Sequence, residues 1–130
     1  MPITSHLKVC GFHIDVFGHV NNARYLEFME IARWELIQQT QLIPLLEKNN
    51  WGMSIVNINI NYRQAAFLGD ELTIVTDIKK VGTKSVTSSQ IIYRNGDELI
   101  CDAEVIFVML DKNTGKSLTV AESMGPLLAK

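Results

Sequence analysis

The sequence lacks several features that would place a short chain in a secreted or membrane class. It has two cysteines, Cys10 and Cys101, and three prolines in 130 residues. Two cysteines without metal-type spacing favour free thiols in a reducing compartment over a disulfide, so we expect two buried thiols. The longest apolar run, residues 105–110, falls far short of the ~20 residues of a membrane helix.

Charge excess and an N-terminal apolar core are also missing. The formal net charge is -2, and the absence of a basic excess argues against a nucleic-acid partner. Residues 1–8 contain no apolar core of a signal peptide. We therefore expect a soluble, cytoplasmic protein. A chain of 130 residues can bury a core without disulfides or a metal, which predicts a single domain over residues 1–130.

Common catalytic motifs are missing as well. No serine lies in a Gly-x-Ser-x-Gly elbow, and no glycine-rich phosphate loop occurs. His13, Asp15 and His19 invite a metal interpretation, but their spacing is not a zinc spacing and no further Cys or His completes a set. We predict neither a metal nor a cofactor.

An amphipathic helix is the strongest pattern that is present, over residues 23–36. Apolar side chains recur at i, i+3, i+4 and i+7, the spacing of one helical face. That face carries Tyr25, Phe28, Met29, Ala32 and Leu36. The far side also carries Ile31 and Trp34, so we expect the helix to be buried on more than one face.

The loop before this helix offers the best candidate chemistry. Asn21 or Asn22 suits the N-cap, and the free N–H groups and dipole of the helix start favour developing negative charge. Asp15 lies upstream, on a loop that Gly18 allows to turn sharply. A carboxylate facing a helix start can act as a base or nucleophile beside an oxyanion hole. The alternative, which spacing alone favours, is that Asp15 only caps the helix or a turn.

The rest of the chain is typical of β-strands. Predicted strands cover residues 7–12, 51–63, 71–81, 84–93 and 98–111, with a short sixth at 116–120 and a helical piece at 44–50. Asn95-Gly96 predicts a tight hairpin turn. One long helix followed by antiparallel strands makes an α+β domain, with the sheet wrapped around the helix.

The strand over residues 51–63 alternates cleanly. Val56, Ile58, Ile60 and Tyr62 share one face, which we assign to the helix. Asn57, Asn59 and Asn61 share the other. Asparagine is depleted in strands, so these three are either solvated or hydrogen-bonded across a subunit contact. We favour the contact.

Two groups of residues resemble a known family. Residues 15–25, with Asp15, Gly18, His19, Asn21, Asn22 and Tyr25, followed by Glu27, Phe28, Ala32 and Arg33, are similar to the signature of the hotdog-fold acyl-CoA thioesterases, the relatives of 4-hydroxybenzoyl-CoA thioesterase. The runs 56–63 and 82–85 resemble the bacterial long-chain acyl-CoA thioesterases more closely. The likeness covers roughly residues 7–111.

This resemblance implies a hotdog fold, an antiparallel sheet of five to six strands around one central helix. It implies Asp15 as the catalytic carboxylate and the backbone N–H of Asn22 as the donor that polarises the thioester carbonyl. Asp15 would either attack directly, giving an anhydride, or activate water. His19 and Asn21 would orient water or the loop; the alternative is that both only brace the turn.

The resemblance also implies substrate contacts and self-association. The candidates beside the acyl chain are Phe17, Gly18, Phe28, Met29 and Trp51, and those for the coenzyme A phosphates are Arg63, Lys84 and Arg94. Two subunits would share each active site, with the partner contributing residues near 53–61, as a homodimer or a tetramer.

The expected activity is hydrolysis of long-chain fatty acyl-CoA. One alternative is a thioesterase for short-chain or aromatic acyl-CoA, or for acyl carrier protein. Another is a non-catalytic module that binds acyl thioesters, which would not need a carboxylate at the carbonyl.

Overall fold

The computed structural model describes residues 2–128. The elements in chain order are β1 (Ile3–Lys8), η1 (Gly11–His13), α1 (Asn22–Gln38), α2 (Leu42–Asn49), β2 (Trp51–Tyr62), β3 (Glu71–Val81), β4 (Ser85–Arg94), β5 (Glu98–Asp111), β6 (Ser117–Leu118) and α3 (Val120–Leu128).

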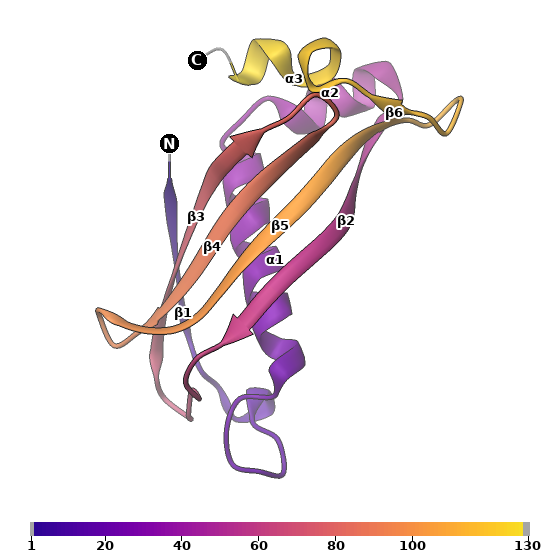
Figure 1. Cartoon of the computed structure of the whole chain (residues 1–130). Helices are drawn as coiled ribbons and strands as arrows, with labels where there is room; N and C mark the ends of the chain where they lie inside the picture. The colour runs from indigo at the N-terminus through magenta and orange to yellow at the C-terminus, as the bar shows by residue number, and fades with distance from the viewer. Residues whose placement is uncertain (1, 129–130) are drawn as a thin grey trace.

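The strands form one antiparallel sheet in the order β1-β3-β4-β5-β2, with β6 paired to β5. Helix α1 lies along one face of this sheet, and the long strands cross it at a slant (Figure 1). The loop before α1 lies at one end of the molecule, and α2, α3 and β6 gather at the other (Figure 1). The predicted α+β architecture, with one long helix against an antiparallel sheet, is confirmed.

The inner face of α1 supplies much of the core. Tyr25, Phe28, Met29 and Ala32 are all buried, as their helical spacing predicts. The opposite face is different, because Ile31 is 54% exposed and Trp34 is 45% exposed. The expectation that α1 is buried on more than one face is therefore wrong for the single chain, since one sheet covers only one side of a helix.

A polar layer divides the core into two apolar clusters. The inward residues of β4 run Val86, Ser88, Gln90 and Ile92, all buried. Ile92 belongs to the cluster around the first half of α1, and Val86 to the cluster under α2 and α3. Gln90 lies between them, where its Nε2 donates to the Met29 carbonyl at 2.9 Å and to Thr76 Oγ1 at 3.0 Å.

The first strand was placed too late in the chain. We predicted residues 7–12, whereas β1 is Ile3–Lys8, in register with β3 from Ile3↔Thr76 to Lys8↔Glu71. After Val9 the chain turns, and His13 Nδ1 accepts the Cys10 N–H at 2.9 Å. This turn leaves Cys10 exposed, contrary to prediction, while Cys101 is buried and both thiols are free.

The last helix was missed. We predicted a strand at 116–120, but β6 is only Ser117–Leu118 and α3 begins at Val120. A capping box marks this start, because Thr119 N–H donates to Glu122 Oε1 at 2.7 Å and Glu122 N–H donates to Thr119 Oγ1 at 3.2 Å. The Thr-x-x-Glu spacing was the signal in the sequence that could have revealed α3.

The other elements follow the prediction with small shifts. The hairpin between β4 and β5 is confirmed, although three residues, 95–97, separate Arg94 from its partner Glu98. Asn95 and Gly96 have φ of 49° and 115°, the positive values that such turns require. The alternation of β2 is interrupted at Val56, which the pairing with β5 passes over as a bulge between Ile55 and Asn57.

The buried amide of Gln90 yields a stability prediction. In Gln90→Leu the volume is nearly kept, but Arg33 Nη1, which donates to Gln90 Oε1 at 3.1 Å, loses its acceptor. Because the half-buried guanidinium and Thr76 Oγ1 would lose their partner, we expect the free energy of unfolding to fall by about 1–3 kcal/mol.

Urea denaturation would measure this change. Gln38→Leu, the same substitution at an exposed position of α1, is the matched control and should stay within about 0.5 kcal/mol of wild type. Equal stability of the two variants would contradict a role for the polar layer.

Candidate functional site

A tight loop over residues 15–19 presents the candidate carboxylate. Asp15 N–H donates to the His19 carbonyl at 3.0 Å, and Gly18 N–H donates to the Asp15 carbonyl at 3.0 Å. Gly18 has a φ of +85°, a conformation that a residue with a Cβ adopts only with strain. Asp15 Oδ1 accepts the N–H of Phe17 at 2.9 Å. One carboxylate oxygen therefore fixes the turn, as the capping alternative predicts, while Oδ2 has no hydrogen-bond partner among the described residues.

The start of α1 leaves one donor free. Asn21 is the N-cap, and its Oδ1 accepts the N–H of Ala23 at 2.9 Å. The Asn21 N–H donates to the His13 carbonyl at 2.9 Å. Within the described part of the chain, no acceptor takes the N–H of Asn22. This N–H is one of the unsatisfied donors that every helix start presents.

The segment after β2 holds the loop and the helix start in place. Val20 N–H donates to the Ala66 carbonyl at 2.9 Å. The Ala66 N–H in turn donates to the Tyr25 hydroxyl at 3.1 Å, inside the core. The N–H and the carbonyl of Ala66 thus both bind the segment 15–25. Ala66, far along the chain, therefore sets the position of Asp15.

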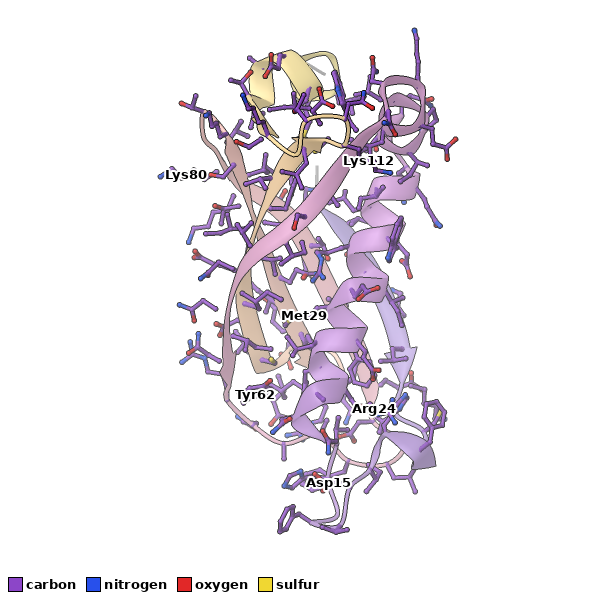
Figure 2. The ribbon with its side chains drawn as sticks, turned by 90° about the vertical axis from the view of Figure 1, so that its right-hand side faces the viewer. Asp15, Arg24, Met29, Tyr62, Lys80 and Lys112 are labelled. Carbon is purple, nitrogen blue, oxygen red and sulfur yellow. The ribbon has the colours of Figure 1, made fainter. Side chains whose placement is uncertain are left out.

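Asp15, His19 and Asn22 line one hollow of about 460 Å³. Its remaining lining comes from Phe17, Val20, Tyr25, Tyr62, Arg63, Gln64 and Ala65. A second hollow of about 820 Å³ lies on the other side of Asp15 and Phe17, and Asn21 and Arg24 line it. Asp15 and Phe17 separate the two. In Figure 2 Asp15 lies at the tip of the molecule, with Tyr62 on the β2 side and Arg24 on the opposite side of α1.

The two histidines of the loop differ in environment. His19 is half-buried, its Nδ1 lies 3.2 Å from the Val20 carbonyl, and its ring stacks beside Phe17 at a centroid distance of 6.3 Å. His13 is buried, with its ring 4.2 Å from Phe12 and 4.9 Å from Phe28 between centroids. Burial, and then the charge of Arg24, lower the pKa of His13, so its imidazole is neutral at neutral pH. His13 is a structural residue that accepts a backbone N–H.

The candidate phosphate ligands have different surroundings. Arg63 lines the smaller hollow, and its Nε donates to Asp102 Oδ2 at 2.7 Å. That hydrogen bond lowers the pKa of Asp102, so the pair is ionised at neutral pH. Arg94 is instead held among the Ala65 carbonyl, Gln64 and Glu98, and its role is to brace the segment 64–70.

Four of the expected substrate residues do not lie beside Asp15 in the single chain. Phe28 and Met29 are 2% and 0% exposed, so their side chains lie in the core of the single chain and not in the hollow, and their role beside the acyl chain stays a prediction. Met29 lies between α1 and the sheet in Figure 2. Trp51 begins β2 and pairs with Asp111, whereas Tyr62, at the other end, lines the hollow. Lys84 precedes β4 in the β3–β4 turn, at the end away from Asp15.

Two tyrosines make contacts at the site that the sequence did not reveal. Tyr62 was assigned only to the apolar face of β2, and Tyr25 to the signature and the apolar helix face. Their rings meet edge to face at 5.4 Å between centroids, and each hydroxyl bonds a backbone group near the site. The sequence signal was the tyrosine itself, whose hydroxyl needs a partner when the ring is buried.

The chain matches the thioesterase-like superfamily over residues 11–127. It is also 41% identical, over 117 residues that make up 89% of each chain, to the long-chain acyl-CoA thioesterase FadM of Escherichia coli (strain K12). The chain belongs to the thioesterase-like superfamily.

Solved structures of similar proteins agree with this family. The probable thioesterase YbaW of Escherichia coli has a TM-score of 0.91 and 39% identity, with 96% of this chain and 95% of that one covered. The SAV2348 protein of Staphylococcus aureus, solved in complex with CoA, has a TM-score of 0.89 at 18% identity, with 99% of this chain and 82% of that one covered. The second likeness concerns the fold alone. Thus the fold and family implied by the sequence signature are both confirmed.

Other features of the described residues concern metals and membranes. In residues 2–128, no three His, Cys, Asp or Glu side chains gather as a metal site requires. No helix in that part of the chain has the length and apolar character to cross a membrane.

Proposed function

We propose that this thioesterase-superfamily chain hydrolyses acyl-CoA thioesters, with long fatty acyl chains preferred. Water and acyl-CoA give the free acid and coenzyme A. The observation that supports the proposal is the smaller hollow, because Asp15, which carries the carboxylate, and Asn22, which carries the unsatisfied N–H, both line it. The 41% identity to a long-chain acyl-CoA thioesterase supports the substrate class.

The chemistry needs only these two groups. The thioester oxygen accepts the Asn22 N–H, and one such donor contributes roughly 10²- to 10³-fold to kcat. The free oxygen of Asp15 either removes a proton from the attacking water or attacks the carbonyl itself. In both routes the C–S bond breaks, the thiolate leaves and takes a proton, and water supplies the oxygen of the acid. His19, which lines the same hollow as Asp15, would orient the water.

Partly exposed apolar side chains on the facing flanks of α1 and β2, Leu26 and Ile58, suit the acyl chain, and we call the space between them the apolar gap. Glu35 of α1 accepts a hydrogen bond from Ser5 of β1 at 2.7 Å, so that flank of the helix faces β1. Leu26 precedes Glu35 by two and a half helical turns, at about 3.6 residues per turn. It therefore lies on the opposite flank of α1, which faces β2. Leu26 is 37% exposed and Ile58 of β2 is 38% exposed. An acyl chain entering past Tyr62 would bury both.

Edge strand β2 supports self-association. It is the last strand of the sheet, so one row of its backbone groups has no strand partner within the described chain. Antiparallel pairing of β2 with a second copy would continue the sheet and cover the apolar gap. It would also bring the partner's Trp51 end toward Tyr62. Trp51 and Lys84, remote from Asp15 in one chain, would thereby approach the site of the partner.

Asn61 already bonds Asp102 in its own chain at 3.2 Å, so Asn57 and Asn59 are the asparagines left for such a contact.

The role of Asp15 yields the second prediction. Asp15→Asn keeps the Oδ1 acceptor for Phe17 and so keeps the loop, but the amide is neither a base nor a nucleophile. We expect kcat for palmitoyl-CoA to fall by about 10²- to 10⁴-fold, with an unchanged melting temperature. Release of free thiol measures the rate.

Asp77→Asn is the matched control, because Asp77 Oδ1 also accepts a nearby backbone N–H, from Ile78 at 2.9 Å, on a strand away from the site. It should keep wild-type kcat. Wild-type kcat in Asp15→Asn would refute the mechanism, and a wild-type protein that binds palmitoyl-CoA without releasing thiol would favour the non-catalytic binding module.

The apolar gap yields the third prediction, on acyl length. Each buried methylene contributes roughly 0.8 kcal/mol, or about a fourfold change in kcat/KM. We therefore expect kcat/KM to climb from butyryl-CoA to at least lauroyl-CoA, and 4-hydroxybenzoyl-CoA to be a poor substrate because the gap offers its hydroxyl no polar partner. A maximum at butyryl- or hexanoyl-CoA, or a preference for the hydroxybenzoyl thioester, would favour the short-chain or aromatic alternative.

The open edge of β2 yields the fourth prediction. Light scattering should give at least twice the chain mass of 14.6 kDa. Ile58→Lys places a charge in the covered gap and should shift the protein toward monomer and lower kcat. Val81→Lys, at a side chain 50% exposed on β3, is the control and should change neither. A fully active wild-type monomer at assay concentration would contradict the shared site.

A further inference from the structure

Tyr62 contacts the start of α1 from the end of β2. Its hydroxyl donates to the carbonyl oxygen of Asn22 at 3.1 Å. Its ring meets Tyr25 edge to face, with 5.4 Å between centroids and 74° between planes. The side chain is 47% exposed and lines the same hollow as Asp15. Tyr62 thus lies at the site without a contact to Asp15 in the described hydrogen bonds.

The hydrogen bond of Tyr62 acts on one peptide unit that is also held at its other end. The carbonyl of Asn22 and the N–H of Ala23 belong to the same planar peptide. Tyr62 donates to the carbonyl, and the N–H donates to Asn21 Oδ1 at 2.9 Å. Two side chains therefore hold this peptide in line, and hydrogen bonds in such a chain strengthen one another.

Fixing this peptide restrains the N–H of Asn22. That N–H belongs to the preceding peptide, which shares the Cα of Asn22 with the peptide that is held. If the plane of the Asn22–Ala23 peptide is fixed, only rotation about the φ and ψ of Asn22 can reorient the Asn21–Asn22 peptide, which carries the Asn22 N–H. The Asn21 N–H, bonded to the His13 carbonyl at 2.9 Å, limits rotation from the other side. The orientation of the Asn22 N–H is thereby restrained, and within the described residues this N–H has no acceptor.

The surroundings keep Tyr62 able to donate. Burial raises the pKa of its hydroxyl above the ordinary value, so the proton stays on the oxygen at neutral pH. Tyr25 is itself anchored, because its hydroxyl accepts the Ala66 N–H at 3.1 Å. The ring of Tyr62 therefore rests on a fixed side chain.

We propose that Tyr62 is a positioning residue for thioester hydrolysis, which acts through the Asn22–Ala23 peptide to aim the Asn22 N–H at the thioester oxygen. The inference rests on the proposed function. It links the last residue of β2, the edge strand, to the oxyanion donor through one peptide.

The test compares kcat and KM in Tyr62→Phe. Phenylalanine keeps the ring against Tyr25 and removes only the hydroxyl. We expect kcat for palmitoyl-CoA to fall about tenfold, as for a weakened transition-state hydrogen bond, with KM within about twofold of wild type. Tyr93→Phe removes a hydroxyl from the residue before the last one of β4 and is the control, with no change in kcat.

Asn21, which holds the other end of the same peptide, provides a test that a merely structural role would fail. Asn21→Ala frees the other end of the same peptide and should also lower kcat about tenfold, while Asn21→Ser restores a side-chain acceptor and should recover much of the loss. Because both side chains hold one peptide, the double variant Tyr62→Phe/Asn21→Ala should be little slower than either single variant. Effects that multiply would overturn the inference.

The remaining outcomes separate the inference from the function. Wild-type kcat in Tyr62→Phe, with Asp15→Asn inactive, would overturn the positioning role and leave the thioesterase intact. A raised KM at unchanged kcat would assign Tyr62 to substrate contact and also overturn it. Full activity of Asp15→Asn would refute the proposed function itself. Melting temperature and light scattering on each variant identify loss of fold or of assembly. The positioning role is contradicted if the loss of kcat follows a loss of fold or assembly and Asn21→Ser gives no recovery.

Discussion

The contact between the start of α1 and the chain that leaves β2 is the constraint on which the site depends. Ala66 uses its N–H to bind the Tyr25 hydroxyl and its carbonyl to bind Val20 N–H. The loop that carries Asp15 contains a positive-φ glycine and few apolar side chains that reach the core. Its conformation is therefore fixed by these bonds rather than by its own packing.

Packing makes that contact rigid. Phe28, Met29 and Ala32 follow Tyr25 on the buried face of α1, so the first half of the helix is immobilised against β3, β4 and β5. The far half meets a separate cluster under α2 and α3. The polar layer at Gln90 separates the two and ties the Met29 carbonyl to the sheet.

The open edge of the sheet connects assembly with chemistry. Strand β2 has β5 on one side only, and it ends at Tyr62, which bonds the first residue of α1. Its inner face is covered by α1 only in part, since Ile58 is still 38% exposed. If a second copy pairs with β2, as we propose, the same strand bears the subunit contact, one wall of the acyl gap and the hydrogen bond to the oxyanion segment. A thioesterase site of this design would be complete only in the assembled protein.

The sequence by itself determined the elements whose pattern is repeated and local. The apolar face of α1, the full extents of β3 and β5 and an N-cap at Asn21 or Asn22 follow from spacing of 3.6 or 2 residues and from capping chemistry, and the structure shows that the cap is Asn21. The signature over residues 15–25 also identified Asp15 and Asn22, which the fold does bring to one hollow. The strand β1 and the helix α3 were harder, because the polar Ser5 occupies a buried position of β1 and a capping box was read as strand.

Tertiary structure decided everything that joins distant segments. Phe28 and Met29 have the composition of an acyl channel, but the sheet covers them and makes them core. Arg63 and Arg94 look alike in the sequence, yet one lines the hollow beside Asp102 and the other is held by Gln64, Ala65 and Glu98. Tyr62 lies 40 positions from Asn22, and no local pattern links the two. Only the packing of the sheet against α1 brings that hydroxyl to the helix start, because two residues so far apart in the sequence have no fixed distance until the chain folds.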